Sequence, residues 1–398
     1  MPLDEFTMPR RAVRDERTGR EVWQVTDGDF ECVAAYMECG VWSADDRYLV
    51  VACNRTGTWQ PYRLELSTGR ARQLAHVVNG GYRSINVHAP SGEVFCWSGS
   101  GFLAVDLETL RQRQAADLSR FGALHDFSGG KGMTPALSGD AGLVAVGRGV
   151  WKDAPSPSCG IVLASLDGSN AFEEITVDHQ DLAEFNLGHL MICPGDDDLL
   201  AFTKAHKDNP WNDGQASGNG LPNANPFLAA GLYGVSRRTG QVRVLVNAGM
   251  GYRATHCVWS RSGARVYWHR KSCPGWVPTA LCSNDRQGGD LRVHFETDLY
   301  KLGHSQASPD ERWIVTDSQD PDENILMLVE TKSGASHLLC WPNASINSTR
   351  PDKRRADLPP HTDRHTHPGF SNTARYVHYT SDISGRSQVY VVPVGDVT

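Results

Sequence analysis

The sequence lacks the features that mark several common classes of protein. No apolar run reaches the roughly 18 residues needed to cross a bilayer, and the first 20 residues are polar, without the apolar core of a signal peptide. Basic residues are not in excess, since 39 Lys and Arg stand against 46 Asp and Glu, for a net charge of −7. A general nucleic-acid binder needs a basic face that displaces counterions from phosphate. We therefore expect a cytoplasmic protein that binds neither membranes nor nucleic acid.

Paired cysteines and long helical patterns are also missing. The ten cysteines contain no C-x-x-C pair and are scattered over 398 residues, which argues against a zinc ribbon and against a disulfide-rich secreted module. We expect reduced thiols, mostly buried. Few stretches have a long apolar period of 3.6 residues, whereas 39 Gly, 21 Pro and 11 Trp are present. This composition favours short strands joined by turns.

A turn phrase followed by an apolar strand recurs seven times along the chain. The intervals between successive turns run from 46 to 67 residues, close to the roughly 40 to 50 residues of a propeller repeat with loops inserted. The seven turns begin at Ser43, Ala89, Ser138, Cys193, Ser260, Ser308 and Ser371. In most units, further short strands follow the first one. Each unit is therefore interpreted as a four-stranded antiparallel blade.

The two ends of the chain complement each other. The last unit stops one strand short at 389–394, while the strand-like segment 21–25 precedes the first full unit. The first segment can complete the last blade, which closes the ring and removes exposed strand edges. We expect an all-β, seven-bladed β-propeller that forms one domain over 1–398, with long loop insertions at about 207–226 and 341–364. Two β-sandwiches are the alternative, but sandwiches do not require one turn phrase to recur seven times.

Four histidines share one position in the repeat. His189, His256, His304 and His367 each stand four residues before the turn, in units four to seven. The strand before this turn is the innermost strand of a blade, so we expect these side chains to meet at one mouth of the central channel. His365 joins them, because a spacing of two residues points both side chains to one face of a strand.

Converging imidazoles favour a metal site. A single histidine is more often an ordinary hydrogen-bonded residue, but neutral imidazole is a common ligand of divalent transition metals, and four share this register. No carboxylate occupies the register, so the predicted site is rich in nitrogen and open to water, unlike a closed structural zinc site. Gln306 points the same way as His304 in a regular strand. It could add an oxygen ligand or cap a neighbouring blade.

The ordered histidine phrases resemble those of a known family, the oligogalacturonate lyases of polysaccharide lyase family 22. The phrases are Leu187-Gly-His-Leu, Thr255-His-Cys-Val-Trp, Gly303-His-Ser and His365-Thr-His-Pro-Gly-Phe, and the opening segment 16–26 is similar too. The resemblance implies a seven-bladed propeller that holds manganese through three histidines and a glutamine. It also implies cleavage of short galacturonate oligomers by β-elimination in the cytoplasm, as part of pectin degradation. It places the metal ligands at His304, His365 and His367, and the Brønsted base at His256.

The sequence departs from the family pattern at two places. The family's glutamine ligand precedes the His-x-His pair by three residues, where this chain has Thr362, next to His361. His361, Gln306 or water could take the fourth ligand position. The family's active-site arginine is also missing, because the corresponding stretch 228–233 contains none. Arg253 or Arg83 could supply its charge, although for either one alone the pattern favours an ordinary surface arginine.

The reaction suits these residue types. The proton on C5 of a uronate is very weakly acidic, because the neighbouring carboxylate is negatively charged. A divalent cation and an arginine stabilise the charge that develops when this proton leaves. A neutral histidine such as His256 can remove the proton near neutral pH, and His189 could orient the substrate or protonate the leaving oxygen. The expected product is a 4,5-unsaturated uronate.

Other functions fit the same fold, because propellers support many unrelated functions. A lyase for a different uronate-containing oligosaccharide would use the same metal and base. A catalytically silent sugar-binding propeller is suggested by the missing arginine. An interaction propeller of the WD type would carry a closing Trp-Asp in its blades, and the sequence has no such dipeptide. A small uronate oligosaccharide is therefore the expected partner and Mn²⁺ the expected cofactor.

Overall fold

The computed structural model describes residues 2–8, 10–78, 80–121, 124, 134–148, 159–177, 185–206, 230–249, 252–272, 276–320, 322–346 and 364–397. Regular structure in these ranges is almost entirely β, with 30 strands. The two helices found there are the three-residue 3-10 turns η1 (Tyr82–Ser84) and η2 (Ser119–Phe121). Neither is long or apolar enough to cross a bilayer.

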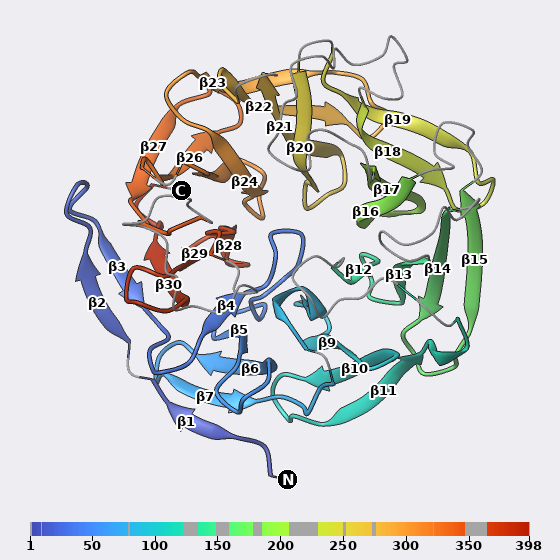
Figure 1. The fold of residues 1–398 in the computed structure, drawn as a ribbon, viewed down its shortest axis with the longest axis horizontal. Helices are drawn as coiled ribbons and strands as arrows, with labels where there is room; N and C mark the ends of the chain where they lie inside the picture. The colour runs from blue at the N-terminus through green and yellow to red at the C-terminus, as the bar shows by residue number, and fades with distance from the viewer. Residues whose placement is uncertain are drawn as a thin grey trace.

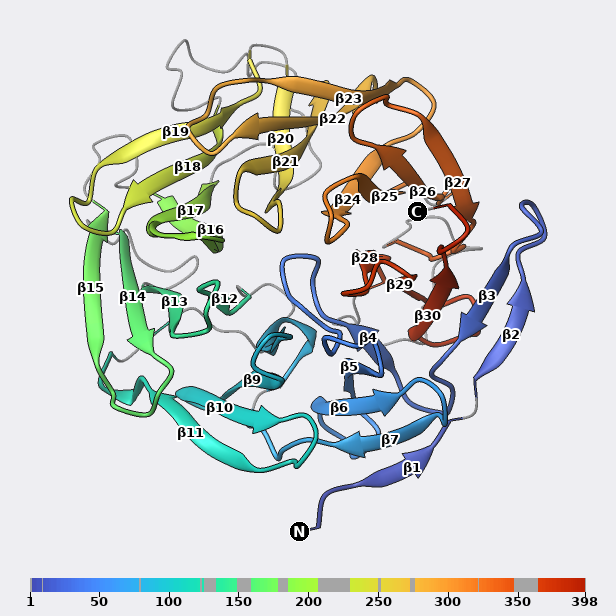
Figure 2. The same ribbon diagram turned by 180° about the vertical axis from the view of Figure 1, so that it is seen from behind.

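The strands form seven antiparallel sheets that stand as blades around a central axis (Figures 1 and 2). From the outer to the inner strand, blade one contains β1 (Glu5–Thr7), β7 (Arg70–Gln73), β6 (Gln60–Glu65), β5 (Tyr48–Cys53) and β4 (Cys32–Ala34). Blade two contains β11 (Gln112–Asp117), β10 (Gly101–Asp106), β9 (Glu93–Ser98) and β8 (Ile85–His88). Blade three contains β15 (Phe172–Val177), β14 (Cys159–Ser165), β13 (Leu143–Arg148) and β12 (Ala136–Leu137).

The remaining four blades complete the circle in the same order of strands. Blade four contains β19 (Val242–Asn247), β18 (Ala230–Ser236), β17 (Asp196–His206) and β16 (Phe185–Cys193). Blade five contains β23 (Arg292–Thr297), β22 (Thr279–Asp285), β21 (Arg265–Ser272) and β20 (Tyr252–Trp259). Blade six contains β27 (Ser336–Cys340), β26 (Leu326–Glu330), β25 (Trp313–Ser318) and β24 (Leu302–Ala307). Blade seven contains β2 (Arg11–Arg14), β3 (Glu21–Gln24), β30 (Gln388–Pro393), β29 (Tyr376–Ser381) and β28 (Gly369–Phe370).

The N-terminal strand closes the ring, as the sequence predicts. β3 pairs with β30 in antiparallel register, with Trp23 opposite Val391 and Gln24 opposite Tyr390. The blue N-terminal strands therefore lie beside the red C-terminal ones in Figure 1. β2 extends this blade by a fifth strand and β1 does the same for blade one, which the sequence pattern does not reveal. The seven-bladed, all-β fold is confirmed, while the extent of one domain over 1–398 stays a prediction.

The repeated turn phrase has a similar backbone geometry in all seven blades, with the positive-φ residue three residues after the first turn residue in six turns and two residues after it in the fourth. Each turn contains a residue with positive φ, between 55° and 74°, namely Asp46, Gly92, Ala141, Gly195, Gly263, Glu311 and Ala374. In the five turns that begin with serine, the Ser Oγ accepts a hydrogen bond from the backbone N–H five residues later, at 2.9–3.2 Å. A short hydroxyl side chain that satisfies a nearby backbone donor stabilises a tight turn. This chemistry explains why serine recurs at the first position.

The apolar core lies between neighbouring blades. One cluster joins Trp42 and Leu49 of blade one to Val389 and Val391 of blade seven, and similar clusters fill the other interfaces between blades. Eight of the ten cysteines are described as free thiols and all eight are buried, as expected. Of the predicted insertions, 207–226 and most of 341–364 lie outside the described residues.

A buried histidine at the interface of blades seven and one predicts acid sensitivity. Nδ1 of His378 accepts a hydrogen bond of 3.0 Å from Nε1 of Trp42, and burial lowers the pKa of His378 to about 3, from an ordinary value of 6.5. The unfolded chain therefore binds this proton at a higher pH than the folded chain, so stability is complete above about pH 6.5 and falls as the pH falls towards 3. The expected contribution is about 1.4 kcal/mol of unfolding free energy per pH unit.

Urea unfolding at several pH values between 7 and 5 measures this slope. His378→Gln keeps an acceptor for Trp42 but cannot be protonated in this range, so its slope should be shallower than that of the wild type. Equal slopes for the two proteins would contradict the assignment.

Candidate metal and catalytic site

The histidines of the repeat register stand on distorted backbone at the inner strands. His189, His256 and His367 have positive φ values of 45°, 53° and 40°. The pairing of the inner strand with its neighbour shifts register around His189, His256 and His304, in β16, β20 and β24. Bulges of this kind redirect a side chain away from the regular pleat, and positive φ at a residue other than glycine is concentrated at functional sites.

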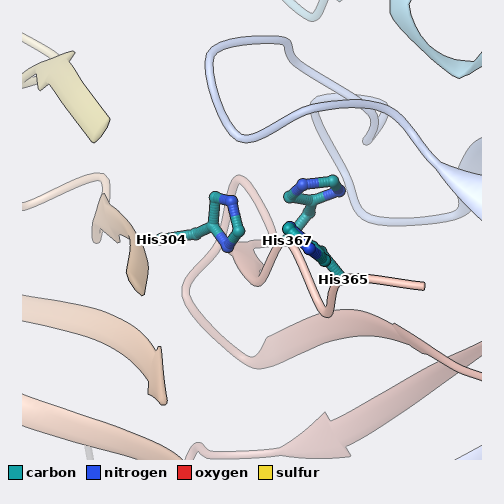
Figure 3. Close-up of side chains that lie close together, drawn as sticks. All are labelled: His304, His365 and His367. Carbon is teal, nitrogen blue, oxygen red and sulfur yellow. The ribbon is translucent and has the colours of Figure 1, made fainter. Parts of the chain in front are cut away.

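Four imidazoles lie in contact with one another. The ring centroids of His304 and His367 are 4.3 Å apart and those of His256 and His304 are 4.4 Å apart. His365 lies 5.3 Å from His304 and 5.6 Å from His367. Figure 3 shows His304, from β24, facing His365 and His367, which come from the segment just before β28. Residues from three different blades thus meet at one point near the axis.

Three of these histidines have the geometry of a ligand set. One ring nitrogen from each of His304, His365 and His367 lies within 4.8 Å of the others, and no other group of three or more His, Cys, Asp or Glu side chains in the described ranges meets this criterion. His304 and His367 are buried, and His365 is partly exposed. Three imidazoles with one open side suit a divalent transition metal that keeps positions for water or substrate. The residues therefore fit such an ion.

A buried carboxylate orients His304. Oδ2 of Asp317, on β25, lies 3.1 Å from Nδ1 of His304, and Oδ1 accepts the backbone N–H of His304 at 2.6 Å. Thr366 also donates its hydroxyl to Asp317. Burial would raise the pKa of Asp317, but the charge of His304 and these hydrogen bonds outweigh it and hold the pKa well below the ordinary value. The carboxylate therefore remains anionic and leaves Nε2 of His304 for a ligand bond, as in many metal sites.

His256 is buried beside other titratable groups, including His304 and Lys271. Its Nδ1 is buried and has no hydrogen-bond partner in the described part of the chain. Burial, together with the charges of His304 and Lys271, holds the pKa of His256 well below its ordinary value. Lys271 is itself fully buried, where its Nζ donates to Gln319 at 3.0 Å and lies 4.0 Å from the ring centroid of Trp276. His256 is therefore a neutral imidazole at physiological pH.

His189, on β16, contacts the loop between β4 and β5, and this loop also contacts the other histidines. The loop extends to the centre of the ring (Figure 1). Tyr36 of this loop has ring centroid distances of 5.3 Å to His189, 5.7 Å to His304 and 4.7 Å to His367. Nδ1 of His189 is 2.6 Å from Oε1 of Glu38 in the same loop. Tyr36 and Glu38 thus connect His189 to the other histidines.

Of the two candidate arginines, Arg83 contacts rings that pack on the histidine group. Its guanidinium carbon is 4.2 Å from the ring centroid of Tyr36, and its Nε donates to the Tyr82 hydroxyl at 2.9 Å. Tyr82 in turn stacks on His367, with 5.9 Å between centroids. Arg253 instead lies 4.5 Å from the centroid of Trp276, on the side of Lys271. The two arginines therefore flank different sides of the histidines.

The amide of Gln306 is held by backbone groups of two other blades. Its Oε1 accepts the N–H of Phe370 at 2.8 Å, and its Nε2 donates to the carbonyl of Met37 at 2.8 Å. Gln306 thus caps neighbouring blades, which was the alternative to a metal ligand, and the metal group proposed below does not include it. His361 and Thr362, the other candidates near the fourth position, lie outside the described residues.

A cavity of about 500 Å³ lies along the axis on the side of the repeated turns. Its described lining includes Glu38, Thr134 and Arg261, but none of the five histidines of the site. Most of its polar side chains are already bonded: Thr134 donates to Glu38 and Asn86 donates to Pro135. Glu38 lines this cavity and also bonds His189, so it connects the cavity with the histidine group.

Comparisons with known proteins agree with this arrangement. No family model matches the chain. An oligogalacturonide lyase of Pectobacterium atrosepticum is 21% identical over 415 residues, which cover 96% of this chain and 95% of that protein. The chain is similar to oligogalacturonate lyases. The expected resemblance is thereby confirmed.

Solved structures give the same result for the fold. An oligogalacturonate lyase in complex with manganese has a TM-score of 0.77 at 18% identity, with 98% of this chain and 97% of that chain covered. An oligogalacturonate lyase from Vibrio parahaemolyticus has a TM-score of 0.78 at 19% identity, with 100% and 99% covered. The likeness to these lyases therefore extends over the whole propeller.

Several side chains of the site are not found by sequence reasoning. Tyr36 and Glu38 belong to a loop that carries no repeat phrase, and Asp317 and Lys271 stand on second strands, outside the histidine register. The repeat offers one usable signal: Asp317 stands opposite the entrance of β24, so pairing the predicted strands would have placed it near His304. No comparable signal indicates the two loop residues.

Asp317→Asn tests the orientation of His304 directly. The amide keeps the shape of the side chain but loses the negative charge that holds the imidazole. We expect the affinity for Mn²⁺ to fall about 10- to 100-fold, as measured by calorimetric titration of the metal-free protein. Asp290→Asn, at an exposed ion pair with Arg265 on blade five, is the matched control and should leave the affinity unchanged. Wild-type affinity in Asp317→Asn would show that this carboxylate does not support a metal ligand.

Proposed function

We propose that the protein is a metal-dependent lyase that cleaves short oligogalacturonates by β-elimination, giving a 4,5-unsaturated uronate, a step in pectin degradation. One observation carries the proposal: His304, His365 and His367 can share one ion while His256 lies in contact with them. The similarity to oligogalacturonate lyases over the whole chain, one of them in complex with manganese, supports it.

His304, His365 and His367 would hold the ion, and Mn²⁺ is proposed from the similar protein that contains it. Such an ion, when bound, withdraws negative charge from the carboxylate beside C5 of the substrate. Asp317 keeps His304 in place for this role.

His256 is proposed as the base that removes the proton from C5. Its buried Nδ1 leaves Nε2 as the nitrogen that can meet the substrate. Its low pKa, caused by burial and neighbouring positive charge, keeps the lone pair available at neutral pH. Together with the ligand group, it gives the site both a proton acceptor and a place for the substrate carboxylate.

Arg83 is proposed to bind a uronate carboxylate, in place of the arginine that the chain lacks at 228–233. Its guanidinium stands on Tyr36, whose ring touches two of the proposed metal ligands. Guanidinium groups suit this task because their paired N–H donors match the two oxygens of a carboxylate. Arg253, beside Lys271 and Trp276, is the second candidate and would meet a neighbouring sugar unit.

The direct test is the ultraviolet absorbance of the unsaturated product after digalacturonate or trigalacturonate is added to manganese-loaded protein. A rise that a chelator abolishes is the expected result. A flat trace from protein that binds the metal would contradict galacturonate as the substrate. Other uronate oligosaccharides in the same assay then distinguish a lyase of different specificity from a silent sugar-binding relative.

A cytoplasmic location is part of the proposal. The eight described cysteines are free and buried in the interfaces between blades, and chains with many unpaired cysteines are typical of reducing compartments.

Two histidine variants separate the proposed roles. His256→Ala should lower kcat by about 10²- to 10⁴-fold, the usual contribution of a general base, while metal content stays intact. His367→Ala should lose both turnover and metal, because it removes a ligand. Metal content is measured by atomic emission after dialysis, and turnover by product absorbance. Metal retention in His367→Ala would remove that residue from the ligand set.

Arg83→Gln should raise KM for digalacturonate about 10- to 100-fold, since a hydrogen bond to a charged group contributes about 1.5–3 kcal/mol. Arg113→Gln is the matched control, because Arg113 of β11 pairs with Glu93 of β9 in blade two, and this variant should leave KM unchanged. If KM rises in Arg253→Gln and not in Arg83→Gln, the role belongs to Arg253.

A further inference from the structure

Three side chains from three blades form a continuous hydrogen-bonded chain beside the proposed base and ligands. His189 of β16 meets Oε1 of Glu38 at 2.6 Å through its Nδ1. The hydroxyl of Thr134, which precedes β12, donates to Oε2 of the same carboxylate at 2.6 Å. Both oxygens of Glu38 are therefore bonded, and its orientation is fixed from two sides.

The carboxylate of Glu38 is anionic although it is buried. Its side chain is 4% exposed. Burial would raise the pKa of Glu38, but the charge of His189 and hydrogen bonds from His189 and Thr134 outweigh it and lower the pKa. An ionised carboxylate can only accept hydrogen bonds. Nδ1 of His189 must therefore carry the proton of their shared hydrogen bond, which leaves Nε2 as the reactive nitrogen.

His189 is partly exposed, whereas Glu38 is buried. The imidazole side chain is 30% exposed and packs on Tyr36, which also touches His304 and His367. Its backbone φ of 45° and the bulge in β16 hold it in this position. A histidine presented on one side and bonded to a carboxylate on the other has the arrangement that stabilises an imidazolium in catalytic triads.

We propose that His189 is the acid that protonates the departing O4 of the substrate and that Glu38 is the positioning residue that enables it. This assignment rests on the proposed β-elimination. His256 takes the proton from C5, and the electron pair of the C5–H bond forms the C4–C5 double bond. The C4–O4 bond breaks with its electron pair on O4, which receives the proton from Nε2 of His189. Exchange with water then returns both histidines to their starting states.

The different surroundings of His189 and His256 agree with the roles of acid and base. Nδ1 of His189 is hydrogen-bonded to the carboxylate of Glu38, whereas Nδ1 of His256 has no hydrogen-bond partner among the described residues and the buried Lys271 lies in its surroundings. Two like groups with opposite environments are the usual arrangement for an acid and a base in one site.

A change of leaving group tests the proposal. Digalacturonate needs a proton on its leaving oxygen, whereas a galacturonide with fluorine at C4 releases fluoride without one. Glu38→Gln and His189→Ala should lower kcat on digalacturonate about 100-fold, with KM within about threefold of the wild type, and should change kcat on the fluoride by less than about fivefold. His256→Ala should lose activity on both substrates. Equal losses on both substrates in the Glu38 and His189 variants, or no loss on either, would overturn the proposal.

A spectroscopic readout separates this proposal from the proposed function. In the metal-free wild type, the ¹⁵N shifts of His189 should report a proton on Nδ1, and Glu38→Gln should change that pattern; an Nδ1 without a proton would overturn the Glu38 role. If the wild type eliminates from neither substrate, the proposed function fails while the ¹⁵N result still decides the pairing.

Should Glu38→Gln not fold, Thr134→Val loosens the same carboxylate and should show the same contrast between substrates at a few-fold level. Glu65→Gln, at an exposed ion pair with Arg47, is the control and should match the wild type.

Discussion

The pairing of β3 with β30 is the interaction on which the rest of the structure depends. Every blade buries its faces against two neighbours, so blades one and seven would each expose an apolar face in an open array. Joining the two ends removes both exposed faces at once. The bond from the N–H of Val25 to the carbonyl of Val389, at 3.0 Å, and the bond from Thr26 to Gln388, at 2.6 Å, continue the connection beyond the strand pairs. Because the ring is closed, inner strands from different blades can hold side chains at fixed mutual distances.

Backbone distortion at the inner strands then converts a structural repeat into a site. The turn after each inner strand contains a residue with positive φ in all seven blades. Bulges and positive φ occur at the histidines of the same register, so their rings leave the regular pleat and meet near the axis. The strained backbone at His189, His256 and His367 persists because the regular strands of the seven blades hold it in place.

The sequence predicts those parts of the structure that repeat from blade to blade. The seven turns, the ring closure and the histidine register all follow from one periodic phrase, because each unit must solve the same packing problem. Glu38 and Tyr36 escape this reasoning, since they lie in a loop whose path to the centre depends on the finished ring. Asp317 is an intermediate case, because pairing the predicted strands brings it near His304 although the contact itself lies across a bulge. Gln306 is in phase with the site, and its amide is hydrogen-bonded to backbone groups of blade seven and of the loop between β4 and β5.

The loop between β4 and β5 joins parts of the ring that are far apart in the sequence. Its Tyr36 packs against the histidines, its Met37 accepts a bond from blade six, and its Glu38 bonds blades three and four. Met37 and Glu38 of the same loop also line the cavity of about 500 Å³. A single short segment therefore contacts both the histidine group and the cavity, so a substitution in this loop would alter the two regions together.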